Sequence, residues 1–133
     1  MDEAAVPVDP TLVSRGRFQV DEGVERGRAL LRRQDRPTAI ITGNDLQALG
    51  VYQAAREVRL HIPEDLSVVG FDDLPVATWV GPPLTTVRQP LVQMAVAGAR
   101  LALRLANGEH PSQTRVELAT ELIVRESTAP PNR

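Results

Sequence analysis

The 133-residue sequence has no cysteine, only two histidines, few aromatic residues (3%) and no excess of basic residues. Without cysteine it can form neither a disulfide framework nor a thiolate metal site, and His61 and His110 are too far apart to suggest a ligand cluster. The formal net charge of −2 gives no basic surface for nucleic acid or an anionic membrane. We therefore expect no metal, no cofactor and no direct DNA contact by this chain.

Long hydrophobic runs are also missing. No apolar stretch approaches the roughly 20 residues of a membrane span. The start, MDEAAVPVDP, is acidic and short, unlike a secretory signal with its basic flank. We expect a cytoplasmic protein that does not interact with membranes.

The residues that are present favour one globular α/β domain. Hydrophobic residues make up 42% of the chain, enough for a core in a chain of this length. Apolar runs of strand length alternate with amphipathic segments of helix length. We expect strands at 11–18, 38–42 and 66–71 and helices at 22–33 and 45–58. This order predicts a parallel, doubly wound sheet with right-handed crossovers.

The second half of the chain differs in character. A proline-rich connector carries a short strand at 84–88, a helix begins at Pro90 and stops before Gly108, and residues 115–127 supply one or two late strands. One helix and short strands cannot enclose a core. We therefore expect the helix face that contains Met94 and Leu101 to lack a cover.

Polar residues follow two of the predicted strands. Asn44 comes after the strand at 38–42, and Asp72 directly follows the strand at 66–71. Ligands of open parallel sheets bind at the carboxyl ends of the strands. An amide and a carboxylate at that edge suit a polyhydroxylated ligand, and Phe18 could provide an apolar plate for a sugar ring.

Asp72 is not needed for a helix cap, which favours a ligand role, but the other polar residues at the strand ends and Phe18 also have a simpler structural interpretation. Asn44 could cap the following helix or bind ligand, and for Asp45 a cap is the favoured interpretation. Asp73 is expected to be a cap or turn residue. Phe18 could belong to the core.

Several linked segments resemble the effector-binding core of LacI/GalR-type bacterial transcription regulators. They are PTAIITGND, VVGFDD, PPLTTVRQP and VELATELIVREST, in order between Pro37 and Thr128. The resemblance implies a periplasmic-binding-protein-like type I fold in two lobes, behind a helix-turn-helix headpiece that binds operator DNA as a dimer. It implies effectors that are mostly sugars, with Asn44 and Asp72 on effector hydroxyls and Phe18 against the ligand.

The sequence departs from that family at its front, where the headpiece and most of the N-terminal lobe have no counterpart. We therefore expect an incomplete two-lobed sensor domain. Residues 1–83 would form the C-terminal effector-binding lobe without its first unit. Residues 84–115 would be the return strand and helix of the other lobe, and 116–133 closing strands and a tail. Operator DNA would be reached only through a headpiece absent from this chain.

The helix at 45–58 has more apolar surface than one sheet can cover. We expect Leu49, Trp79 and Val80 to form a self-complementary patch for a homodimer, although core packing of Leu49 is an alternative. The expected function is effector sensing, with a sugar as effector, in a transcription regulator. A sugar-binding protein of an ABC transporter is the alternative. Catalytic motifs are lacking, and we do not expect an enzyme.

Overall fold

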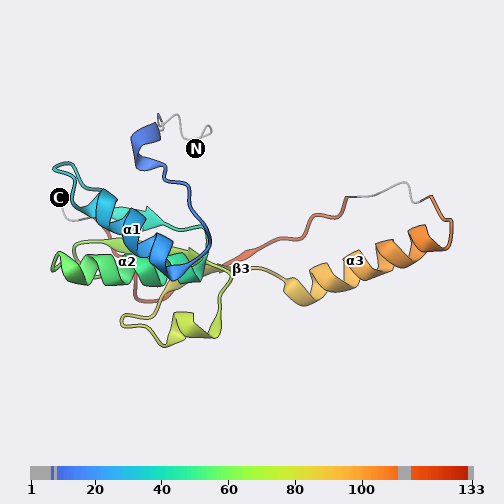
Figure 1. Ribbon diagram of the computed structural model, residues 1–133. Coiled ribbons are helices and arrows are strands. Elements are labelled where there is room, and N and C mark those ends of the chain that lie inside the picture. Colours follow the sequence, from blue (N-terminus) through green and yellow to red (C-terminus); the bar gives the residue numbers. More distant parts are fainter. Residues whose placement is uncertain (1–6, 8, 111–114, 132–133) are drawn as a thin grey trace.

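The computed structural model describes residues 7, 9–110 and 115–131. Its elements in chain order are the 3-10 turn η2 (Pro10–Leu12), α1 (Val20–Leu31), β1 (Ala39–Ile41), α2 (Asp45–Glu57), β2 (Ser67–Phe71), the 3-10 turn η3 (Pro75–Thr78), β3 (Thr85–Arg88), α3 (Leu91–Ala106) and β4 (Glu121–Ile123). Figure 1 shows a body that runs from α1 to β3, and an arm formed by α3 and the chain that returns from it.

A four-stranded sheet in the order β1-β2-β3-β4 forms the centre of the body. The first three strands are parallel and β4 is antiparallel to β3. The expectation of a parallel-dominated α/β sheet is confirmed. Because β1 and β2 run in the same direction, with Ile41 opposite Val69, the segments that follow them leave the sheet at one edge.

Helices α1 and α2 pack side by side over one face of this sheet (Figure 1). Glycines allow their backbones to touch. A Cβ on Gly23 would lie 2.2 Å from the carbonyl oxygen of Gln47, and one on Gly50 would lie 2.2 Å from that of Val20. The core fills the space between the helices and the sheet and consists of Leu31, Ile40, Ala48, Val51, Tyr52, Ala54, Ala55, Leu66, Val68, Ala77 and Leu84.

The expected first strand, at 11–18, is wrong. Pro10–Leu12 form a 3-10 turn, and residues 13–19 run as exposed chain outside any strand. A β-strand needs a neighbour for its backbone hydrogen bonds, and the described sheet offers none to this segment. The other predicted helices and strands up to residue 107 occur within two residues of their expected limits, whereas the region expected to supply one or two late strands, 115–127, contains only the short strand β4 among its described residues.

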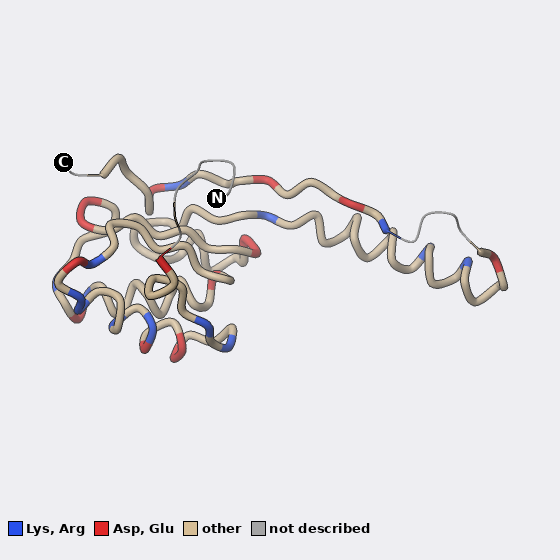
Figure 2. The backbone as a smooth tube through the Cα atoms, turned by 90° about the horizontal axis from the view of Figure 1, so that it is seen from above, with Lys and Arg blue, Asp and Glu red and all other residues tan. Residues whose placement is uncertain are grey.

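The arm has little contact with the body. Among its described residues, α3 has none that is buried, and Met94 is 45% exposed. Figure 2 shows α3 and the returning chain extending together away from the sheet. The expectation of an uncovered apolar face on this helix is therefore confirmed. Its apolar surface cannot add to the core between α1, α2 and the sheet.

Gly50→Ala should lower the free energy of unfolding by about 2–3 kcal/mol, because the new methyl group meets backbone that cannot rotate away. Urea denaturation followed by circular dichroism measures the change. Gly98→Ala is the matched control. Its Cβ meets no atom within 4 Å, so the substitution should only improve helix propensity, by up to about 1 kcal/mol. Equal stability of Gly50→Ala and the wild type would contradict the close packing of α1 and α2.

Candidate effector-binding site

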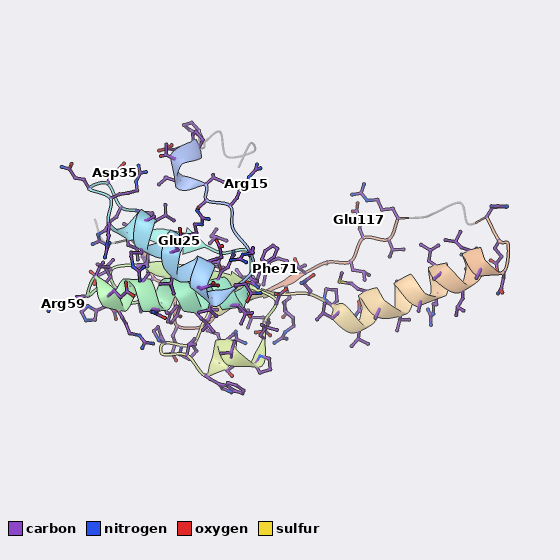
Figure 3. The ribbon with its side chains drawn as sticks, in the orientation of Figure 1. Arg15, Glu25, Asp35, Arg59, Phe71 and Glu117 are labelled. Atoms are coloured by element: carbon purple, nitrogen blue, oxygen red, sulfur yellow. The ribbon has the colours of Figure 1, made fainter. Side chains whose placement is uncertain are left out.

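The carboxyl edge of β1 and β2 brings together three chain segments. They are the residues before α1, the start of α2 and the loop after β2. The site residues Phe18, Asn44 and Asp72 lie in these three segments, respectively. Figure 3 labels Phe71, the last residue of β2, where the arm leaves the body. Parallel pairing thus places Asn44 and Asp72 at one edge of the sheet, and a hydrogen bond from Asn44 joins Phe18 to the start of α2.

Asn44 caps α2. Its Oδ1 accepts a hydrogen bond from the backbone N–H of Gln47 at 2.9 Å, and its Nδ2 donates to the carbonyl oxygen of Phe18 at 3.4 Å. The side chain is therefore fixed at both ends, and the residue is only 8% exposed. The cap, one of the two interpretations of Asn44, is present in the structure. A ligand could still bond to the remaining amide hydrogen or to the second lone pair of Oδ1.

Gln47 is a second tie between the same two segments, and sequence reasoning missed it. Its Oε1 accepts from the N–H of Gly43 at 3.0 Å, and its Nε2 donates to the carbonyl oxygen of Arg17 at 2.9 Å. The sequence signal was available, because Gln three residues after an N-cap is half of a capping box. Gln47 and Asn44 together hold residues 17 and 18 against the start of α2.

Phe18 is not a core residue. It is 61% exposed, and its ring lies against Gly43, where a Cβ would come within 2.8 Å of the ring edge. An exposed aromatic ring held by its neighbouring backbone is a suitable plate for an apolar ligand face.

The loop after β2 has an unusual backbone. Asp72 and Asp73 have φ values of 106° and 54°, a region that non-glycine residues rarely adopt. The Oδ1 of Asp72 accepts a hydrogen bond from the Nε2 of Gln89 at 2.6 Å. Gln89 lies between β3 and α3, and sequence analysis gave no reason to select it. Strained backbone of this kind persists only where surrounding contacts hold it, and it is concentrated at functional sites.

Asp73 is one of those contacts. Its carboxylate accepts from Arg125 at 2.6 Å and from Arg88 at 2.7 Å. Burial alone would raise the pKa of Asp73, but the hydrogen bonds and charges of the two arginines outweigh it and lower the pKa below the usual range. Asp73 occupies the sharp bend, as a turn residue would, but it does not cap η3, whose N-cap is Leu74.

Asp45 is the first residue of α2, not its cap, so the capping interpretation is wrong. The side chain is fully buried. It accepts from the Oγ1 of Thr86 at 2.6 Å and from the N–H of Leu74 at 2.7 Å. Burial raises the pKa of Asp45, although both hydrogen bonds act in the opposite direction.

The residues expected at a dimer interface differ in exposure. Trp79 is 78% exposed, Leu49 is partly exposed, and Val80 is partly buried against the core. The described positions thus leave Trp79 as the most accessible apolar side chain of this group.

A groove of about 440 Å³ lies along the edge of β1, between α1 and the chain around Leu12–Gly16. Neither Asn44 nor Asp72 lines it. This groove is therefore separate from the two polar residues of the candidate site. Among the described residues no cluster of His, Asp and Glu could hold a metal ion, and no described helix is long and apolar enough to cross a bilayer.

The topology and this edge define a periplasmic-binding-protein-like α/β unit. The family model of the periplasmic binding protein-like domain matches residues 1–128, and the chain belongs to this family. Within it, the chain matches the C-terminal core of LacI-type transcription regulators. This agrees with the resemblance found in the sequence.

Three similar proteins show the extent of the match. The chain is 42% identical over 132 residues to the HTH-type transcriptional regulator DegA of Bacillus subtilis strain 168, which is 99% of this chain and 39% of DegA. It is 40% identical to the transcriptional regulator CelR in complex with cellobiose, with a TM-score of 0.87 over 94% of this chain and 38% of that one. A LacI-family regulatory protein from Chloroflexus aggregans is 36% identical, with a TM-score of 0.86 over 97% of this chain and 47% of that one. These relatives favour a regulator over a transporter component.

The lowered pKa of Asp73 predicts a loss of stability in acid. A carboxyl group whose pKa is lower in the folded state than in the unfolded state stabilises the folded state. The stabilisation is complete at pH values above the pKa of the unfolded state, near 3.8. It is lost as the pH falls through the pKa of the folded state. Asp73→Asn should therefore be less stable than the wild type near neutral pH, by on the order of 2 kcal/mol, and the difference should shrink in acid. Urea denaturation at a series of pH values measures it. A difference that stays constant down to the acid limit would contradict the ion pairs.

Proposed function

We propose that this chain is the effector-sensing core of a LacI/GalR-type transcription regulator, that its effector is a sugar, and that Phe18, Asn44 and Asp72 contact the sugar. One observation carries the proposal. An exposed aromatic residue is hydrogen-bonded through its carbonyl oxygen to the amide that follows β1, and a carboxylate follows the parallel neighbouring strand β2, in a chain 40% identical to a regulator solved with cellobiose.

The chemistry of these groups suits a sugar. Each hydroxyl both donates and accepts, and a carboxylate oxygen can accept more than one hydrogen bond. Asp72 can therefore accept from a sugar hydroxyl beside, or in place of, the amide of Gln89. The ring of Phe18 offers a flat apolar surface for the C–H face of a pyranose. No nucleophile paired with a base is needed, and we propose that the chain senses its ligand without catalysis.

The chain spans 39% of the length of DegA. We therefore propose, by analogy with such longer relatives, that it regulates transcription as part of a whole regulator. In the family, a headpiece binds operator DNA and a second lobe closes over the effector. A ligand that bridges the two lobes binds one arrangement of the lobes more tightly than the other. This difference in affinity shifts the headpieces toward or away from the arrangement that binds the operator. Strand β3 leads directly into the arm, so it is a suitable connector for that movement. We propose that the regulator acts in the cytoplasm, where its DNA lies.

Sugar binding by this chain can be tested by NMR. Titration with cellobiose, and with lactose and monosaccharides as competitors, should shift the amide signals of Asp72 and Asn44 and the ring signals of Phe18. We expect the sugar to be contacted by one lobe only in this chain. The dissociation constant should therefore be about millimolar, which corresponds to a binding free energy of about −4 kcal/mol.

Asp72→Ala should weaken this binding by about tenfold or more, since a hydrogen bond to a charged acceptor contributes about 1.5–3 kcal/mol. Asp35→Ala is the control, because it removes an exposed carboxylate that pairs with Arg33 far from the edge. Equal affinities of the two variants would contradict the role of Asp72. If no sugar shifts any of these signals, the sugar proposal fails.

We also propose that the chain forms a homodimer through the surface of Leu49, Trp79 and Val80. The exposed position of the only tryptophan supports this, because large exposed aromatic residues are enriched in protein interfaces. Leu49 lies on α2, and Trp79 follows η3 directly.

Leu49→Glu and Trp79→Ala should each convert dimer to monomer, because a buried charge or the loss of an aromatic anchor weakens such an interface by about 2 kcal/mol or more. Sedimentation over a concentration series measures the equilibrium. Leu103→Glu is the control, since Leu103 is 65% exposed but lies on the arm. A wild-type monomer at high micromolar concentration would rule the surface out, and dissociation by Leu103→Glu alone would assign association to α3.

A further inference from the structure

We propose that Asp45 is the positioning residue of the effector site, which holds the loop after β2 in the conformation that presents Asp72. This inference rests on the proposed sugar-binding function. Asp45 itself is fully buried and is not proposed to contact the ligand.

The carboxylate of Asp45 joins three elements. It belongs to the first turn of α2, where a negative charge is favoured by the helix dipole. Its Oδ1 accepts from Thr86 of β3 at 2.6 Å, and its Oδ2 accepts from the N–H of Leu74 at 2.7 Å. Both oxygens thus have a donor from a different element, so the side chain is fixed.

Gly70 of β2 makes room for this carboxylate. A Cβ at that position would lie 2.2 Å from the Oδ1 of Asp45. The side chain therefore reaches across β2 to the strand beyond it. A larger residue at either position would separate α2 from the loop.

The backbone of the loop is held at both of its ends, in addition to the side-chain bonds of Asp72 to Gln89 and of Asp73 to two arginines. The N–H of Asp72 donates to the carbonyl oxygen of Val87 at 2.9 Å, and the N–H of Leu74 donates to Asp45. Between these two hydrogen bonds lie the positive φ angles of Asp72 and Asp73. Because relaxed backbone would leave that region, removal of the Asp45 acceptor should release the loop and turn the Asp72 carboxylate away from the edge.

Substitutions at Asp45 should differ in how they affect the hydrogen bonds from the hydroxyl of Thr86 and from the N–H of Leu74. Alanine removes both acceptors. Asparagine keeps one oxygen for the N–H of Leu74, and its amide can donate to the hydroxyl of Thr86, which can reverse its role and accept. Thr86→Val removes one donor but leaves the bond to Leu74 in place. We therefore expect the loop to be released by Asp45→Ala and largely retained by Asp45→Asn and by Thr86→Val.

Two readouts on the 133-residue chain test this. Amide hydrogen exchange should show Leu74 exchanging about tenfold faster or more in Asp45→Ala than in the wild type, and close to the wild-type rate in Asp45→Asn. Titration with cellobiose should show an affinity about tenfold weaker in Asp45→Ala, and within about threefold of the wild type in Asp45→Asn.

Leu31→Ala is the stability control, because Leu31 is buried at the far end of α1. It should destabilise the fold without a selective change at Leu74 or in sugar affinity. The proposal is overturned if Leu74 stays protected in Asp45→Ala, if it is released equally in Leu31→Ala, or if the loop is released while the affinity stays unchanged.

Failure of the proposed function has a different signature. If the wild type binds none of the sugars, sugar sensing fails, and the exchange rate of Leu74 still decides whether Asp45 holds the loop. If Asp45→Ala does not fold, the double substitution Asp45→Leu with Thr86→Val replaces it, because apolar groups of similar size fill the space and leave no buried polar partner unpaired. This variant also removes the acceptor of the Leu74 N–H, so an unchanged Leu74 exchange rate in it would also overturn the proposal.

Discussion

The buried carboxylate of Asp45 is the interaction on which the candidate site depends. A carboxylate is expensive to bury unless donors surround it, and here Thr86 and the N–H of Leu74 supply them. The acceptor lies in α2 and its donors lie in β3 and in the loop after β2, so one group fixes the relative positions of three segments. Its place also requires Gly70, since a side chain there would occupy the same space.

A second set of constraints comes from the contact between α1 and α2. Gly23 and Gly50 allow the two backbones to meet, which brings the chain before α1 close to the start of α2. Asn44 and Gln47 then hold residues 17 and 18 by hydrogen bonds to their carbonyl oxygens. The exposed ring of Phe18 is thus positioned by the same packing that forms the core.

The hydrogen bonds of Asp45 and the contact between α1 and α2 explain how an exposed sheet edge can hold the side chains of the candidate site in place. Asp72 and Phe18 are accessible, but the residues that fix them are buried or paired. The arm is different, since its helix has no buried residue among those described. The buried core therefore lies in the body that carries the candidate site, while the apolar surface of α3 is accessible to other parts of a longer protein or to other molecules.

The sequence by itself determined the order of the elements, their parallel pairing and the position of the polar residues at strand ends, because these depend on local periodicity and on short connections. It also indicated the uncovered face of α3. Only the tertiary structure decided which segment lacks a strand partner and which hydrogen bonds join residues far apart in the sequence. Residues 11–18 have strand-like composition but lack a pairing partner in the described sheet. Asp45 has the sequence context of a cap, yet its carboxylate binds Thr86, 41 residues away along the chain. The same holds for Gln89, whose bond to Asp72 spans 17 residues and leaves no periodic or local signal in the sequence.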